Sequence, residues 1–136
     1  HVRMAQHCKN GQAVAEALAN NPKVAHVSYP GLPGDKYYEL AQKYLPNGSC
    51  GVITVDVAGG REAAEKFLGN LKVFSIATHV ADARSCCLHP ASSTHRQLTD
   101  EELVAAGITP GTVRLSCGIE GTEDLINDVE QALAAL

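Results

Sequence analysis

Two periodicities alternate along this sequence, and their alternation limits the available folds more than any other feature. Segments with apolar residues every three or four positions, typical of amphipathic helices, are separated by short β-branched runs of period two, typical of strands. The helix-type segments span 2–20, 35–45, 61–70, 99–107 and 122–134; the strand-type segments span 24–28, 50–57, 73–77 and 113–117, with a short extended piece at 85–88. This order predicts an α/β fold with one sheet of about four strands, mostly antiparallel or mixed, and helices packed mainly on one face.

Local signals predict how three of the helices begin or pack. The apolar stripe of the first helix consists of Met4, Cys8, Val14, Ala15 and Leu18. Asp35 is the expected N-cap of the second helix, whose apolar side consists of Tyr38, Leu40, Ala41 and Tyr44. Thr99 and Glu102 predict a capping box at the start of the fourth helix.

Composition narrows the class of protein further. The 136 residues carry a net charge of −4 and 4% aromatic residues, which argues against a nucleic-acid-binding or anionic-membrane-binding surface. No apolar run approaches the ~20 residues of a membrane span. Five cysteines without a CxxC pair indicate the reduced thiols of a cytoplasmic protein. The chain opens at His1 inside a helical pattern, so we expect a single-domain fragment, 1–136, whose first helix continues from a preceding domain.

Two polar clusters, at 88–98 and 112–120, flank a short helix signal and contain the main candidate for a functional residue. Arg114 lies in an alternating run that reads as a strand with one polar and one apolar face. A guanidinium on such a face can hold a carboxylate or phosphate through two parallel hydrogen bonds. The alternative is a surface arginine paired with a nearby acid.

Other patterns with possible chemistry are weaker. Five histidines and cysteines fall close together, namely His79, Cys86, Cys87, His89 and His95. Their spacing matches no zinc finger, and adjacent cysteines on a strand point to opposite faces, so we expect no metal site and no Cys–His nucleophile. Gly59-Gly60 before a helix lacks a phosphate-binding pattern and predicts a plain strand-to-helix turn.

The motifs His89-Pro-Ala-Ser-Ser-Thr-His95 and Arg114-Leu-Ser-Cys-Gly-Ile-Glu120 occur together, followed by the helix 124–133. In this combination the chain resembles, over essentially its whole length, the C-terminal domain of the Cys/Met-metabolism enzymes that use pyridoxal 5'-phosphate (PLP). Tyr29-Pro-Gly-Leu32 is similar to the family as well. Across 94–108 it is most similar to the O-acetylhomoserine sulfhydrylase branch.

The resemblance implies the small C-terminal domain of a fold-type-I PLP enzyme. In it Arg114 would hold the substrate α-carboxylate, together with His79, while Val80, Ser92 and Thr94 would shape the site. The chain departs from the family at His79-Val80-Ala81, where relatives have Ser-Leu-Gly or Asn-Val-Gly. The different side chain at position 79 changes the contact that this position would make with the substrate.

The family's Schiff-base lysine stands in an S-x-T-K motif, which none of the six lysines here follows. The resemblance therefore implies no catalytic residue in this chain and an inactive isolated fragment without bound PLP. The full-length enzyme would contain an N-terminal PLP domain, form a homotetramer, and act on O-acetyl-L-homoserine and a sulfur nucleophile. Alternatives are a methionine γ-lyase, a cystathionine γ-synthase or lyase and, in another class, a stand-alone binding or interaction module.

Overall fold

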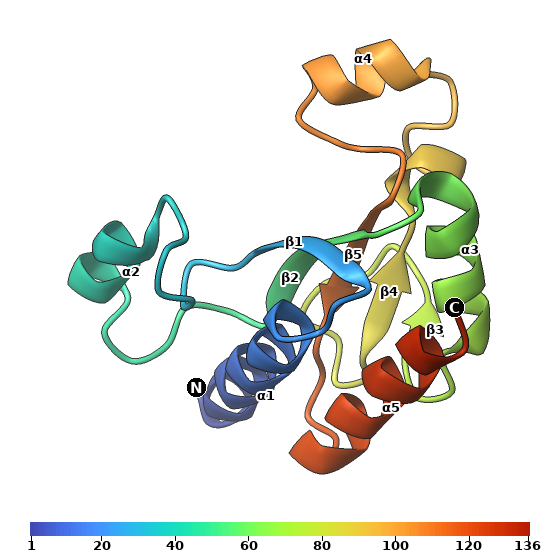
Figure 1. The fold of residues 1–136 in the computed structure, drawn as a ribbon. Coiled ribbons are helices and arrows are strands. Elements are labelled where there is room, and N and C mark those ends of the chain that lie inside the picture. Colours follow the sequence, from blue (N-terminus) through green and yellow to red (C-terminus); the bar gives the residue numbers. More distant parts are fainter.

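A five-stranded mixed sheet forms one layer of the molecule and three helices form the other (Figure 1). The computed structural model describes residues 1–136. The strands are β1 (Val24–Ser28), β2 (Val52–Val57), β3 (Ser75–Ile76), β4 (Cys86–Leu88) and β5 (Thr112–Ser116), in the spatial order β1-β2-β5-β4-β3. Only β3 and β4 pair in parallel. The predicted fold class is confirmed, with one strand more than expected because the extended piece at 85–88 joins the sheet.

Strict alternation in the two central strands gives the sheet two different faces. In β2, Ile53 and Val55 are buried in the core, while Thr54 between them is half-buried on the opposite face. β5 continues the pattern with Leu115 in the core and Arg114 directly opposite Thr54. We call the side that carries Thr54 and Arg114 the helix-free face.

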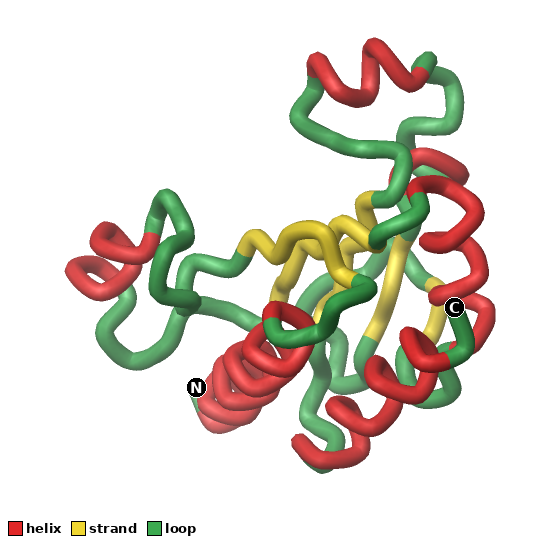
Figure 2. The backbone as a smooth tube through the Cα atoms, viewed as in Figure 1, coloured by secondary structure: helices red, strands yellow, loops and turns green.

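The helices α1 (Val2–Ala19), α3 (Gly60–Asn70) and α5 (Thr122–Ala134) cover the other face, as the tube in Figure 2 also shows. The inward side of α1 differs from the expected one. Met4 is exposed and Cys8 half-buried, whereas His7, Asn10 and Gly11 are buried. A Cβ at Gly11 would lie 2.5 Å from the Cys50 carbonyl oxygen, so glycine lets α1 rest directly on the segment before β2.

Two short helices extend from this body: α2 (Tyr38–Tyr44) and α4 (Asp100–Ala105) (Figure 1). The predicted capping box of α4, Thr99 with Glu102, is confirmed. The predicted N-cap of α2 is wrong: the Asp35 carboxylate instead accepts hydrogen bonds from the backbone N–H groups of Tyr29 and Tyr37, and the helix starts three residues later. Of its predicted apolar side only Ala41 is buried, because nothing in this chain covers α2.

The strand predicted at 73–77 is shorter in the structure, where β3 holds only two residues. The backbone N–H groups of Val73 and Phe74 donate to the carboxylate of Asp128 on α5 instead of a neighbouring strand. This long-range contact removes them from the sheet. After β4 the chain forms a 3-10 helix, η1 (Pro90–Ser92). None of the helices has both the length and the apolar composition that a membrane-spanning helix requires.

Candidate functional site

Arg114 lies in the middle of the helix-free face, where β5 holds it between Thr54 of β2 and Leu88 of β4. Its Nη2 donates a hydrogen bond of 2.8 Å to the carbonyl oxygen of Thr78. None of the ion pairs in the chain includes Arg114, so no acid neutralises it. The guanidinium is anchored through one donor and retains others for an anion.

The segment 78–84 lies along this face and is bonded to the last residue of β5 and to the loop that follows it. The backbone N–H of Ala81 donates to the Ser116 hydroxyl oxygen at 3.1 Å, and the Ala83 carbonyl accepts from Ile119 at 2.9 Å. Ala81 has φ +56°, the only positive value at a non-glycine residue. The chain thus places a strained backbone position three residues after the carbonyl that anchors Arg114.

The structure brings some predicted site residues together and separates others. His79 is exposed and follows Thr78 directly, and Val80 lines a small cavity beside the same segment. Ser92 instead bonds to His89 Nδ1 at 2.8 Å and lines a depression against α3. Thr94 is exposed and bonds to His95 Nδ1 at 2.9 Å. No hydrogen bond links Ser92 or Thr94 to Arg114.

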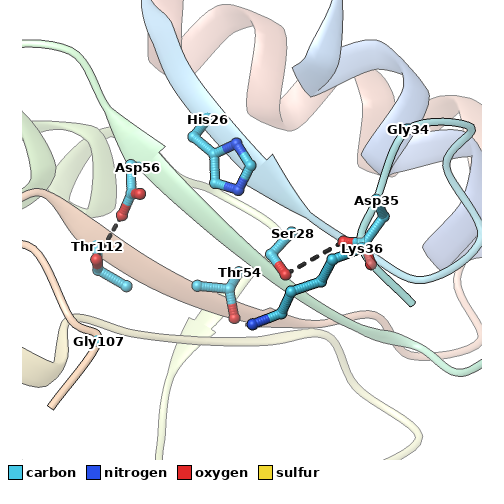
Figure 3. A pocket seen from close by; sticks show the side chains of 9 residues that line it. All are labelled: His26, Ser28, Gly34, Asp35, Lys36, Thr54, Asp56, Gly107 and Thr112. Carbon is cyan, nitrogen blue, oxygen red and sulfur yellow. Dashed lines mark hydrogen bonds between the residues drawn. The ribbon is translucent and has the colours of Figure 1, made fainter. Parts of the chain in front are cut away.

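A polar hollow of about 460 Å³ opens near the β1 edge of the helix-free face (Figure 3). Lys36 points into it towards Thr54, and it is the only lysine that lines it. Asp35 and Asp56 line it as well, and hydroxyl groups bond both carboxylates: Ser28 to Asp35, and Thr112 and Thr109 to Asp56.

These residues do not fit PLP. The two carboxylates would repel the cofactor's phosphate, and the hollow offers no cluster of free donors to replace its hydration. Of the remaining lysines, Lys23 donates to the last carbonyls of α5, and Lys9, Lys43, Lys66 and Lys72 are exposed elsewhere. A PLP site therefore needs groups beyond those of this chain.

Burial controls the titration of the thiols. It raises the pKa of Cys87 and of Cys117 to about 12, and it raises the pKa of the Tyr29 phenol above its usual range. The backbone N–H of Arg84 donates a hydrogen bond to the Asp82 carboxylate and lowers its pKa. No three His, Cys, Asp or Glu side chains meet in a geometry that holds a metal ion, and Cys86 and Cys87 occupy opposite faces of β4 as expected.

Sequence reasoning did not identify the groups that hold segment 78–84 or the buried His7. His7 Nδ1 lies 2.7 Å from the Cys117 carbonyl oxygen, 110 positions along the chain. One local signal was available: His7 stands four residues before Gly11, on the stripe that α1 buries. The bond between Ala81 and Ser116 carries no local signal at all.

Comparisons with known proteins bear on the whole chain. Residues 1–134 match the family model described as Cys/Met metabolism PLP-dependent enzyme. The chain is 47% identical over 133 residues to O-acetyl-L-homoserine sulfhydrylase of Leptospira meyeri, covering 97% of this chain and 30% of that protein. It is 45% identical over 132 residues to L-methionine gamma-lyase of Fusobacterium nucleatum subsp. polymorphum, covering 97% and 33%.

Among solved structures, a Campylobacter jejuni protein assigned as O-acetylhomoserine (thiol)-lyase superposes with a TM-score of 0.90 at 39% identity. The match covers 98% of this chain and 32% of the other. That structure contains N'-pyridoxyl-lysine-5'-monophosphate. The chain thus spans about a third of the length of the relatives it matches.

Proposed function

The chain belongs to the Cys/Met metabolism PLP-dependent enzymes, and on this premise we propose that it is the C-terminal, substrate-carboxylate-binding domain of an O-acetylhomoserine sulfhydrylase. The full-length enzyme replaces the acetate of O-acetyl-L-homoserine by sulfide or a thiol, giving homocysteine or methionine. Enzymes of this family depend on PLP, which supplies the electron sink for such a replacement. The lysine that binds PLP covalently lies outside these 136 residues. This chain contributes Arg114, which anchors the substrate carboxylate.

The proposal rests on the charged and hydrogen-bonding groups that surround the Arg114 guanidinium. A surface arginine paired with an acid was the competing interpretation, and no acid lies within ion-pairing distance. The Thr78 carbonyl orients the guanidinium by accepting a hydrogen bond from its Nη2. The neighbouring cross-strand side chains, Thr54 and Leu88, carry no charge. A planar fork in this setting suits the bidentate recognition of a carboxylate.

Supporting residues follow from the same geometry. His79, adjacent to the Thr78 anchor, offers a second donor to the carboxylate, and Val80 shapes the substrate side of segment 78–84. Ser92 and Thr94 act at longer range, by fixing the turn after β4. We place the enzyme in the cytoplasm, which five free thiols support, and propose a homotetramer completed by the N-terminal PLP domain.

A methionine γ-lyase is the second candidate, because relatives with that name are 43% to 45% identical. Product analysis of the full-length protein separates the two activities. A sulfhydrylase converts O-acetylhomoserine and sulfide to homocysteine and leaves methionine intact. A γ-lyase releases methanethiol from methionine without added sulfide, and that result would move the assignment.

Substitution of Arg114 in the full-length enzyme tests the anchor. We expect Arg114→Lys to raise KM for O-acetylhomoserine about tenfold and Arg114→Ala about a hundredfold, because one and then all charge-assisted hydrogen bonds are lost. The PLP absorbance should stay unchanged. Arg96→Lys, at an exposed arginine without a bonded partner, is the matched control. An unchanged KM in Arg114→Ala would remove the carboxylate role.

A further inference from the structure

Segment 78–84 lies along the helix-free face without joining the sheet or a helix, and most of its side chains are exposed. Its only hydrogen bond to another backbone group runs from the Ile119 N–H to the Ala83 carbonyl, at 2.9 Å. The part before Ala83 therefore depends on side chains for its position. That part includes Thr78, whose carbonyl anchors Arg114.

Side chains hold both backbone groups of Ala81. Its N–H donates to the Ser116 hydroxyl oxygen at 3.1 Å, and its carbonyl accepts from Arg3 Nη1 at 3.3 Å. These partners lie 35 and 78 positions away along the chain. Ala81 has φ +56°, a conformation that persists only where the surrounding structure enforces it. The two bonds act directly on that residue.

Ser116 and Arg114 stand two positions apart on β5 and therefore lie on the same face of the sheet. Because β5 is paired on both sides, by β2 and β4, it fixes their Cα atoms about 7 Å apart. Arg114 bonds to the segment at Thr78, and Ser116 bonds to it three residues later at Ala81. Residues 79–80 span the distance between these two anchors.

The Ser116 hydroxyl has no other bonded partner in the chain. Its cross-strand neighbours are Val52 and Cys86, and neither side chain bonds to it. Ser116 is 2% exposed, whereas Arg3 is exposed and must order a long side chain to reach the same residue. The bond from Ala81 to Ser116 is therefore the firmer of the two, and replacing serine by alanine deletes this one bond.

We propose that Ser116 is a positioning residue for the substrate carboxylate, and that it acts through Ala81. In the proposed function, on which this role rests, Arg114 and His79 bind the carboxylate. Without the Ser116 hydroxyl, the Ala81 N–H loses its acceptor and the strained backbone relaxes. This relaxation moves the Thr78 carbonyl and His79 out of their places beside Arg114. The carboxylate then binds more weakly, while the rest of the substrate keeps its contacts.

Two ligands that differ only in a carboxylate test this role: L-2-aminobutyrate and 1-propylamine. Each is titrated against the full-length enzyme loaded with PLP, with the PLP absorbance as the readout of binding. We expect Ser116→Ala to weaken L-2-aminobutyrate binding about tenfold and to leave 1-propylamine within about twofold. KM for O-acetylhomoserine should rise about tenfold, with kcat within about threefold.

The conservative variant Ser116→Thr keeps a hydroxyl at the same position. A cavity of about 140 Å³ beside Ser116 leaves room for the added methyl group. We expect Ser116→Thr to bind L-2-aminobutyrate within about threefold of the unsubstituted enzyme. A loss that came only from disturbed packing would persist in Ser116→Thr, and that result would overturn the positioning role.

A second variant reaches Ala81 from an exposed side chain, where the risk of misfolding is small. Arg3→Ala removes the bond to the Ala81 carbonyl and should weaken L-2-aminobutyrate binding about threefold, with 1-propylamine unchanged. Arg3→Lys retains a donor and should restore most of the affinity. Lys9→Ala, at an exposed residue of α1 without a side-chain hydrogen bond, is the control that should affect neither ligand.

The positioning role and the proposed function fail in different ways. If Arg114→Ala weakens L-2-aminobutyrate alone while Ser116→Ala weakens both ligands equally or neither, the anchor stands and the positioning role is overturned. If Ser116→Ala does not fold, Arg3→Ala decides, and unchanged binding of L-2-aminobutyrate there would overturn the role. A selective loss in Ser116→Ala, in an enzyme without replacement activity, would overturn the sulfhydrylase assignment and leave the positioning role in place.

Discussion

Ala81 is held in a backbone conformation that is unfavourable for a residue with a side chain. Its φ of +56° lies in the left-handed region, which costs a residue with a Cβ about 1 kcal/mol relative to glycine. Relief of this strain outweighs the extra freedom that glycine gives the unfolded chain, so we expect Ala81→Gly to raise the free energy of unfolding by about 0.5 kcal/mol, measured by urea denaturation.

The matched control is Ala83→Gly in the same segment, where φ is not positive. There glycine only adds freedom to the unfolded chain, so stability should fall by roughly 0.5–1 kcal/mol. Equal effects of the two substitutions would mean that position 81 stores no strain.

The buried thiols make stability depend on pH at the alkaline end. Cys87 and Cys117 keep their protons up to a pKa of about 12 when folded, against 9.0 for an unperturbed thiol. The unfolded chain therefore releases protons that the folded chain holds, and stability falls as pH rises from 9 towards 12. We expect a loss of about 1 kcal/mol per thiol by pH 10 in urea titrations. Cys117→Ala should lessen this slope, and a flat profile would contradict the shift.

At the level of elements, Asp128 ties α5 to the segment between α3 and β3. Its buried carboxylate accepts backbone N–H bonds of 2.8, 2.8 and 3.1 Å from Lys72, Val73 and Phe74. Removing it leaves these donors without an acceptor, so we expect Asp128→Ala to lower the free energy of unfolding by about 3 kcal/mol. Glu130→Ala, exposed on the same helix, should cost less than about 0.5 kcal/mol. Similar losses in thermal or urea unfolding would refute this role.

Elements that depend on local pattern could be predicted, and those that depend on distant partners could not. The alternation of β2 and β5 placed Arg114 on a polar face, and the capping box at Thr99 marked the start of α4. β3 was overestimated because Asp128, more than 50 positions away, takes its N–H groups. The candidate site divides in the same way: Arg114 has a strand pattern, whereas the bond from His7 to Cys117 joins residues 110 positions apart.

On the scale of the whole molecule, α2 is the feature that this chain leaves uncovered. Leu40 and Tyr44 are 53% and 66% exposed on one short helix that extends from the body (Figure 1). Tyr37 and Leu45 continue the apolar surface at its two ends. Grouped apolar side chains of this kind mark an interaction surface on a soluble protein. We therefore expect the isolated 136-residue chain to self-associate through α2.

Sedimentation velocity over a wide range of concentration tests this expectation. The double substitution Leu40→Glu and Tyr44→Glu should shift the chain to monomer, because a dimer through α2 would then bury like charges. Val104→Glu places the same charge at a residue that is 60% exposed on α4, and should leave association unchanged. If Val104→Glu alone dissolves the assembly, the contact runs through α4. If the unsubstituted chain stays monomeric throughout, the exposed face of α2 is too small to hold two copies together.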